Sequence, residues 1–135
     1  MPGPARSTHL ILYVADASRS KAFWREVLGR APRLDVHGMT EFDLPGGAVL
    51  GLMPESGIKR LLGDALPDPS RARGIPRAEV YLPVDDPARA LARALAAGAT
   101  ALDEALPRTW GHEVAYALDP DGHVLALWRP SVVAT

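Results

Sequence analysis

Two stretches of the chain share one alternation of apolar and polar positions. Residues 9–29 read HLILYVADASRSKAFWREVLG, and residues 79–98 read EVYLPVDDPARALARALAAG. Each starts with a polar residue, continues as a short apolar strand that reaches Asp, and then shows helical spacing that ends at Gly. The chain therefore contains an internal repeat with an offset of 70 residues, which aligns Leu10, Leu12, Val14 and Asp16 with Val80, Leu82, Val84 and Asp86.

Each repeat predicts one amphipathic helix, over 17–28 in the first and over 87–97 in the second. Either Asp16 or Ser18 can cap the first helix, because both side chains accept a hydrogen bond from the free N–H groups of a first turn. Pro87 suits the first turn of the second helix, where its missing N–H costs nothing. A glycine follows each helix and ends it.

Two β-hairpins follow the two helices. Residues 39–53 predict a hairpin that turns at 45–47, and residues 113–128 predict another that turns at the Asp-Pro-Asp-Gly of 119–122. The hairpins align with an offset of 75 residues. Each half therefore consists of a strand, a helix and two or three antiparallel strands, and the expected fold class is α+β with two βαβββ modules.

The length of 135 residues corresponds to one domain, which we expect to span residues 1–135. Module one covers about 8–53 and module two about 77–130. The connector, 54–76, is rich in Pro and Gly and predicts one helical turn around 58–62. A connector of this length crosses a surface or reaches a second subunit.

Composition excludes several classes of function. The chain is 47% hydrophobic and 23% charged, as in ordinary globular proteins. A net charge of −1 with scattered basic residues argues against nucleic acid as a partner. The absence of cysteine excludes disulfides, thiolate metal sites and cysteine nucleophiles. Because no signal peptide and no apolar stretch of about 18 residues is found, we expect no membrane partner and a cytoplasmic location.

The repeated βαβββ unit, with YVADASRSKAFWREVLG in the first half and LDPDGHVLALW in the second, resembles the vicinal oxygen chelate superfamily. This superfamily contains glyoxalase I, the extradiol dioxygenases and the bleomycin-resistance proteins. The resemblance covers about residues 8–129 and implies two curved mixed sheets around a cup, with the helices outside. These motifs are specific for the fold and unspecific for the activity.

Strand alternation then assigns residues to the cup. If Leu10, Leu12 and Val14 pack on the first helix, the residues between them face the cup, and the repeat extends this assignment to the second module. The residues expected to face the cup are His9, Ile11 and Tyr13 in the first strand, Glu79, Tyr81 and Pro83 in its repeat, and Gly51, Ala126 and Trp128 in the last strand of each module.

The tryptophans divide into two groups. Trp24, in the middle of the first helix, is expected in the core. Trp110 lies in RTWGHE, ahead of the second hairpin, and either covers the cup as a lid or packs in an ordinary way. Trp128 is expected at the rim, while Tyr13 and Tyr81 point inward, so the cup has aromatic walls.

The resemblance implies that metal-dependent relatives take ligands from four positions, which here are His9, Glu79, Gly51 and Ala126. Gly51 and Ala126 have no donor atom, whereas a catalytic zinc or iron generally needs three protein ligands. We therefore expect no cofactor, with a divalent metal at His9 and Glu79 as the alternative. The two small residues leave room for a mostly apolar pocket with a few polar anchors.

The other histidines and the nearby acids have no spacing that points to a metal. Recruitment of His112, Glu113 or Glu41 as a further ligand has no support in the repeat. His37 and His123 are expected in water beside the hairpin turns.

Glu79 has several interpretations, because an acid at the start of an apolar strand can simply be solvated or can face a ligand. The leading hypothesis for function is a metal-independent protein that binds a small organic ligand in the cup. One alternative is a lyase or isomerase that uses Glu79 as a general base, with or without a metal at His9 and Glu79. A second alternative is a non-catalytic partner-binding module.

We also expect a homodimer with isologous contacts. Each cup then takes His9 from one module and Glu79 from another. The two side chains are expected within reach of each other or of a common ligand. Whether these two modules belong to one chain or to two is left open by the sequence.

Overall fold

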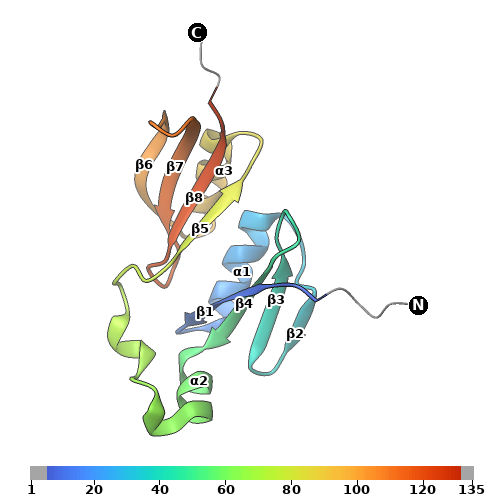
Figure 1. Cartoon of the computed structure of the whole chain (residues 1–135), viewed down its shortest axis with the longest axis vertical. Helices are drawn as coiled ribbons and strands as arrows, with labels where there is room; N and C mark the ends of the chain where they lie inside the picture. The colour runs from blue at the N-terminus through green and yellow to red at the C-terminus, as the bar shows by residue number, and fades with distance from the viewer. Residues whose placement is uncertain (1–5, 132–135) are drawn as a thin grey trace, which may run out of the picture.

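Two four-stranded mixed sheets, each with its own helix, form the protein in a computed structural model that describes residues 6–131 (Figure 1). In module one the strand order is β1-β4-β3-β2, with β1 parallel to β4 and the other pairs antiparallel. Its elements are β1 (His9–Val14), α1 (Ala17–Leu28), β2 (Leu34–Val36), β3 (Met39–Asp43) and β4 (Val49–Pro54).

Module two repeats this topology, with the order β5-β8-β7-β6 and with β5 parallel to β8. The predicted repeat, both helices and both hairpins are therefore confirmed. Its elements are β5 (Glu79–Pro83), α3 (Pro87–Ala96), β6 (Thr100–Pro107), β7 (His112–Leu118) and β8 (Val124–Pro130).

The connector contains more helix than the sequence predicted. α2 spans Glu55–Leu62 and begins directly after β4, and two short 3-10 segments follow at Gly63–Ala65 and Pro69–Ala72. Glu55 is buried and accepts two hydrogen bonds from Arg73, at 2.9 Å from Nε and at 2.6 Å from Nη2. This pair folds the connector back on the start of α2, a tertiary contact that periodicity cannot reveal.

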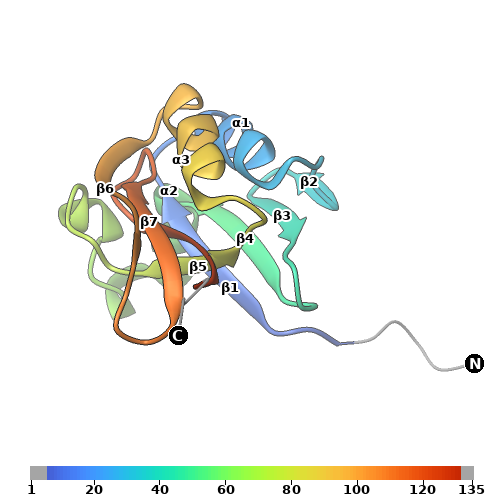
Figure 2. The ribbon, with the colours of Figure 1, turned by 90° about the horizontal axis from the view of Figure 1, so that it is seen from above.

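The two long helices lie side by side and cover the same side of the strands (Figure 2). Asp16, and not Ser18, caps α1, with its carboxylate accepting from the Arg19 N–H at 3.0 Å. Trp24 is fully buried, as predicted, and packs edge-on against Phe23. Burial of each such side chain contributes about 1.5–3 kcal/mol, so the helix layer holds the two modules together.

The apolar core is continuous across both modules, because α1 and α3 contact each other beneath the two sheets. Its buried members are Leu12, Val14, Phe23, Trp24, Val27, Phe42, Leu50, Leu52, Val80, Leu82, Ala94, Ala115, Leu125 and Leu127. Leu10 was expected among them, but 40% of it is exposed. β1 is an edge strand, so Leu10 lacks the cover that its interior neighbour Leu50 receives.

We call the side of each sheet that is turned away from the helices the cup face. Cross-strand neighbours point to the same side of a sheet, so the register places Tyr81, Ala126 and Tyr116 in one row of this face. The equivalent row in module one contains Ile11 and Gly51, followed by Glu41. None of the helices in the described residues has the length and apolar character that crossing a membrane requires.

Candidate functional site

Four ring side chains meet on the cup face of module two, and we call them the Tyr81 cluster: Tyr81, Trp110, His112 and Trp128. The His112 ring stacks on Trp128, with 4.0 Å between centroids and 18° between planes. Tyr81 stacks on the same indole at 5.5 Å and 21°. β5, β7 and β8 thus each contribute one ring, while Trp110 comes from the β6–β7 turn.

Two hydrogen bonds link three members of this cluster. The Trp110 Nε1–H donates to the Tyr81 hydroxyl oxygen at 2.8 Å, and that oxygen lies 2.6 Å from His112 Nδ1. An indole can only donate, whereas a phenol both accepts and donates. His112 Nδ1 accepts the Tyr81 proton in the tautomer that carries its hydrogen on Nε2, and donates to the Tyr81 oxygen in the other tautomer. In both tautomers the Tyr81 hydroxyl joins Trp110 to His112.

The β6–β7 turn positions Trp110. The turn is closed by the Arg108 N–H, which donates to the His112 carbonyl at 2.8 Å, and by the Gly111 N–H, which donates to the Arg108 carbonyl at 3.2 Å. Gly111 has a φ of 88°, a backbone conformation that residues other than glycine rarely adopt. Trp110 is 55% exposed, so it is not part of the core. Its hydrogen bond to Tyr81 holds a large exposed ring in one position.

Glu79 and Tyr116 lie next to the cluster. Burial raises the pKa of the Tyr116 phenol above its ordinary value, and the negative charge of Glu79 raises this pKa further. The Arg108 guanidinium, 5.1 Å from the ring centroid of Tyr116, lowers the same pKa in part. Glu79 itself is exposed, and Ala126 is fully buried between the two tyrosines. A carboxylate, a neutral phenol and a cation thus lie together on this face.

Module one arranges its cup face differently. His9 Nδ1 lies 3.4 Å from Glu41 Oε2, so His9 pairs with Glu41 and not with Glu79. A side chain at Gly51 would place its Cβ 3.1 Å from Ile11 Cγ1 and 3.2 Å from Met39 Sδ. The space expected over Gly51 is therefore already filled, because flexible apolar side chains close over the glycine.

The residues at the four positions implied by the resemblance do not fit a metal ion. Gly51 and Ala126 offer no donor atom, so only His9 and Glu79 of the four positions have one. Within residues 6–131, no three His, Asp or Glu side chains are grouped so that they could hold a metal ion. We derive no chemical step through a metal.

The prediction for His123 was wrong. This side chain is only 3% exposed, and its Nδ1 lies 3.0 Å from Asp119 Oδ2. Asp119 Oδ1 also accepts from the N–H groups of Asp121 and His123, at 2.9 and 2.8 Å. His123 therefore belongs to the structure of the β7–β8 turn, whereas His37 is exposed as predicted.

His112 is the member of the cluster that the sequence reasoning did not place in the site. Alternation along β7 contains the signal, since His112 precedes Val114 and Tyr116 at two-residue steps and so shares their face. The other three members, Tyr81, Trp110 and Trp128, were among the predicted cup residues.

The two βαβββ modules have the fold of the vicinal oxygen chelate proteins. The chain belongs to the glyoxalase-like domain family, which it matches over residues 9–128. No curated protein sequence showed a significant match.

Solved structures with the same fold include proteins from three bacteria. A glyoxalase-related enzyme from Fulvimarina pelagi is 24% identical, with a TM-score of 0.75 and coverage of 91% of this chain and 86% of its own. A glyoxalase/bleomycin resistance protein/dioxygenase family enzyme from Burkholderia phytofirmans is 18% identical (TM-score 0.77, coverage 92% and 98%). A glyoxalase/bleomycin resistance protein from Catenulispora acidiphila is 22% identical (TM-score 0.61, coverage 92% and 97%). At these identities the similarity establishes the fold alone.

Proposed function

We propose that this protein binds a small organic molecule at the Tyr81 cluster and needs no metal to do so. The observation that carries the proposal is the hydrogen-bonded chain from Trp110 through Tyr81 to His112, stacked on Trp128. Small-molecule sites typically combine apolar and aromatic surface with a few fixed polar groups. Rings that are already held in place also lose little conformational entropy when a ligand binds.

The cluster suggests the chemistry of its ligand. A flat, apolar part would stack on the exposed ring of Trp110 or beside Trp128. The Nε2 atom of His112 would form a hydrogen bond with a polar group of the ligand, and the Glu79 carboxylate would accept from a donor. We therefore expect an unsaturated or aromatic molecule that carries at least one oxygen or nitrogen group.

Thermal-shift screening of chelator-treated protein tests this function. Small uncharged aromatic compounds are screened against the wild type, Tyr81→Phe and Tyr13→Phe. A ligand at one hundred times its dissociation constant adds about 2.7 kcal/mol of stability. We expect hits whose effect is lost in Tyr81→Phe and kept in Tyr13→Phe. Hits that are unaffected by Tyr81→Phe, or that require an added divalent metal, would overturn the proposal.

A second candidate function is general-base catalysis by Glu79. It is favoured by the position of Glu79 beside Tyr116, since a carboxylate and a phenol O–H on one face can remove and return a proton. The corresponding reaction is proton transfer at a carbon next to a carbonyl group, as in a lyase or isomerase. Exchange of such protons for deuterium, followed by NMR on small carbonyl compounds, should be catalysed by the wild type and lost in Glu79→Gln. Equal exchange by both proteins would exclude this role for Glu79.

We further propose that the protein is a homodimer. Three large apolar side chains of the connector are exposed: Leu61 by 70%, Leu62 by 48% and Ile75 by 59%. A second copy of the chain would cover such a surface. Light scattering should give twice the monomer mass, and a mass of 14.4 kDa at micromolar concentration would contradict the dimer. The alternative that the protein is a non-catalytic module that binds another protein stays a prediction from the sequence. The cytoplasmic location also stays a prediction.

A further inference from the structure

The two modules meet at two junctions that the internal repeat makes equivalent. At the first, the start of α1 packs against the β7–β8 turn, and the buried Asp121 carboxylate joins them. Asp121 Oδ1 accepts from the Ala15 N–H at 2.8 Å and from Arg19 Nη2 at 3.1 Å. Asp121 Oδ2 accepts from the Ser20 hydroxyl at 2.8 Å. This junction is therefore a complete carboxylate-binding site whose anion is part of the chain.

The second junction has the same backbone frame. The start of α3 corresponds to the start of α1, with Asp85 in the place of Ala15 and Arg89 in the place of Arg19. Asp86 caps α3 through the Arg89 N–H at 3.2 Å, just as Asp16 caps α1.

The turns at the two junctions correspond as well. In the β7–β8 turn the Asp119 N–H donates to the His123 carbonyl at 2.8 Å, and in the β3–β4 turn the Leu44 N–H donates to the Ala48 carbonyl at 2.8 Å. The sequence position that Asp121 holds in the first turn belongs to Gly46 in the second, where the backbone differs, because Gly46 has a φ of 88° and Asp121 a negative φ. The second junction thus lacks the carboxylate that fills the first.

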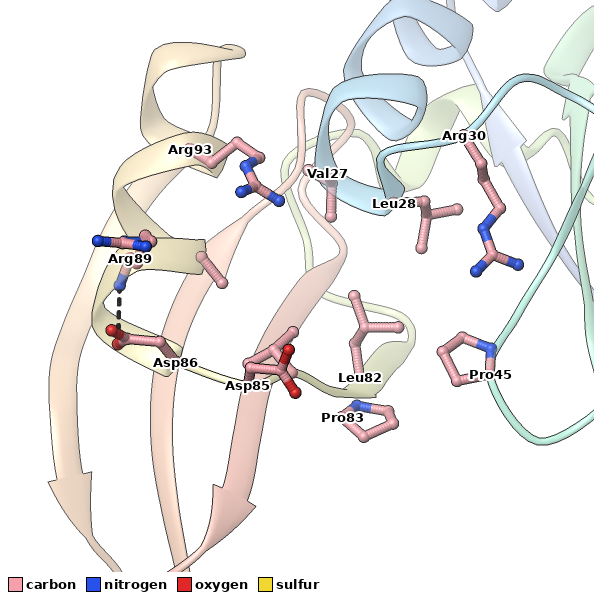
Figure 3. A pocket seen from close by; sticks show the side chains of 12 residues that line it. Val27, Leu28, Arg30, Pro45, Leu82, Pro83, Asp85, Asp86, Arg89 and Arg93 are labelled. Atoms are coloured by element: carbon pink, nitrogen blue, oxygen red, sulfur yellow. Dashed lines mark hydrogen bonds between the residues drawn. The ribbon is translucent and has the colours of Figure 1, made fainter.

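A cavity of about 400 Å³ lies at this second junction (Figure 3). Its apolar walls come from both helices, from β5 and from the β3–β4 turn, and include Val27, Leu28, Pro45, Leu82 and Ala90. Three arginines line it: Arg30, Arg89 and Arg93. Figure 3 shows the Arg93 guanidinium directed toward Val27.

The charges and donors of the cavity favour an anion. The three guanidinium groups outnumber the two carboxylates of the lining, Asp85 and Asp86. Within residues 6–131 none of these arginines forms an ion pair, although Arg30 donates to the Asp43 carbonyl at 3.1 Å. The N–H of Asp85, equivalent to the Ala15 N–H that binds Asp121, makes no hydrogen bond inside the described part of the chain.

We infer that this cavity binds a small organic anion, whose carboxylate or phosphate takes the place that the Asp121 side chain holds at the first junction. The Asp85 N–H and the Arg89 guanidinium correspond to two of the three groups that bind Asp121, Ala90 replaces the third, Ser20, and Arg93 adds a further cation. Charge-assisted hydrogen bonds from guanidinium are among the stronger polar interactions in proteins. The apolar walls accommodate the body of the ligand.

This site is separate from the Tyr81 cluster. None of the four residues of the Tyr81 cluster lines the cavity, although Pro83, which lies opposite Trp128 in the register, does. The inference therefore does not depend on the function proposed for the cup face, and either can fail without the other.

NMR titration with benzoate tests the site, with the neutral benzamide as the matched probe. Benzoate should give saturable shifts of the amide signals of Asp85 and Ala90, and benzamide at the same concentration should not. Arg93→Gln and Arg89→Gln should each weaken the benzoate response at least tenfold, whereas Arg25→Gln, at an exposed position of α1 outside the cavity, should not. Benzoate shifts confined to the indole signals of Trp110 and Trp128, equal shifts from both probes, or no saturable shift would overturn the inference.

A second pair of variants tests the comparison between the junctions. Gly46→Asp adds a carboxylate to the β3–β4 turn, next to Pro45 of the cavity wall, and Gly46→Asn adds the same shape without the charge. Gly46 has a φ of 88°, so both variants bear the same backbone strain, while the space around it is open. Gly46→Asp should compete with benzoate and reduce its binding at least tenfold relative to Gly46→Asn. Equal binding by the two variants would contradict an anion site beside this turn, and if neither folds the arginine variants decide alone.

Discussion

The indole Nε1 of Trp110 donates a hydrogen bond to the Tyr81 hydroxyl at 2.8 Å and so ties a turn residue to the middle of β5. The same hydroxyl lies 2.6 Å from His112 Nδ1. One phenol therefore holds the Trp110 and His112 side chains in position. These two rings form the surface next to Trp128. In this account the cup face of module two is prepared for a ligand before the ligand arrives.

Tyr81→Phe should remove both hydrogen bonds and leave the stacked rings in place. Each bond contributes about 0.5–1.5 kcal/mol, so the expected loss in the free energy of unfolding is about 1–2 kcal/mol, measured by urea denaturation. Tyr13→Phe is the control, because the described residues provide no hydrogen-bond partner for its hydroxyl, and it should change stability by only a few tenths of a kcal/mol. Equal effects of the two variants would show that the Tyr81 bonds are absent in solution.

Tyr116 provides a prediction about pH. Because burial raises the pKa of its phenol above the ordinary value of 10.0, the unfolded chain releases this proton before the folded one does. The contribution to stability is therefore complete below about pH 10 and is lost as the pH rises through the pKa of the folded state. Glu79→Gln should lower the pKa of Tyr116, since Glu79 raises it.

Ultraviolet absorbance of the phenolate measures this titration, and Tyr116→Phe assigns it. Glu104→Gln, at an exposed acid on β6, is the control and should leave the titration unchanged. A Tyr116 transition that is the same in the wild type and in Glu79→Gln would mean that Glu79 does not lie beside this phenol.

Asp121→Ala should destabilise the protein by about 1–3 kcal/mol, because it leaves the Ala15 N–H, Arg19 and the Ser20 hydroxyl without their acceptor. Denaturation by urea measures the loss. Asp64→Ala removes an exposed acid from the connector and should stay within about 0.5 kcal/mol of the wild type. A loss no larger than that of Asp64→Ala would show that the first junction does not depend on its carboxylate.

Glu55→Gln should loosen the connector. The Arg73 side chain donates twice to Glu55, and this hydrogen bonding raises the pKa of Arg73. Loss of the charge weakens the bond that folds the connector back, so limited proteolysis within residues 63–77 should become several-fold faster, while Glu26→Gln on the exposed face of α1 should not change it. Unchanged cleavage in Glu55→Gln would contradict the role given to this pair.

The repeat and most of the elements could be predicted from the sequence because they depend on local patterns. Apolar alternation located β1 and β5, and Asp followed by helical spacing located α1 and α3. Alternation also placed Tyr81 and Trp128 on the cup face. Features that depend on contacts between distant residues could not be read in this way.

His9, Gly51 and His123 show the difference. Alternation oriented His9 correctly but gave no information about its partner, and the structure pairs it with Glu41 on β3. Gly51 was expected to leave space, but Ile11 and Met39 fill it. His123 was expected in water because it follows a turn, yet the Asp119 carboxylate draws it inside. In each case a contact with the side chain of a residue elsewhere in the chain determined the environment of the predicted residue.

The most direct test of the central claim uses the indole N–H signals of the three tryptophans in a ¹H–¹⁵N NMR spectrum of chelator-treated protein. Trp24 is fully buried in the core and serves as the internal reference, and Trp110→Phe assigns its own signal by removal. Small uncharged aromatic molecules that carry a hydrogen-bonding group are added as probes, so that the arginine-lined cavity does not bind them as anions. The account predicts saturable shifts of the Trp110 and Trp128 signals, a constant Trp24 signal, and loss of the shifts in Tyr81→Phe. Saturable binding detected elsewhere on the protein, with Trp110 and Trp128 unchanged, would contradict it.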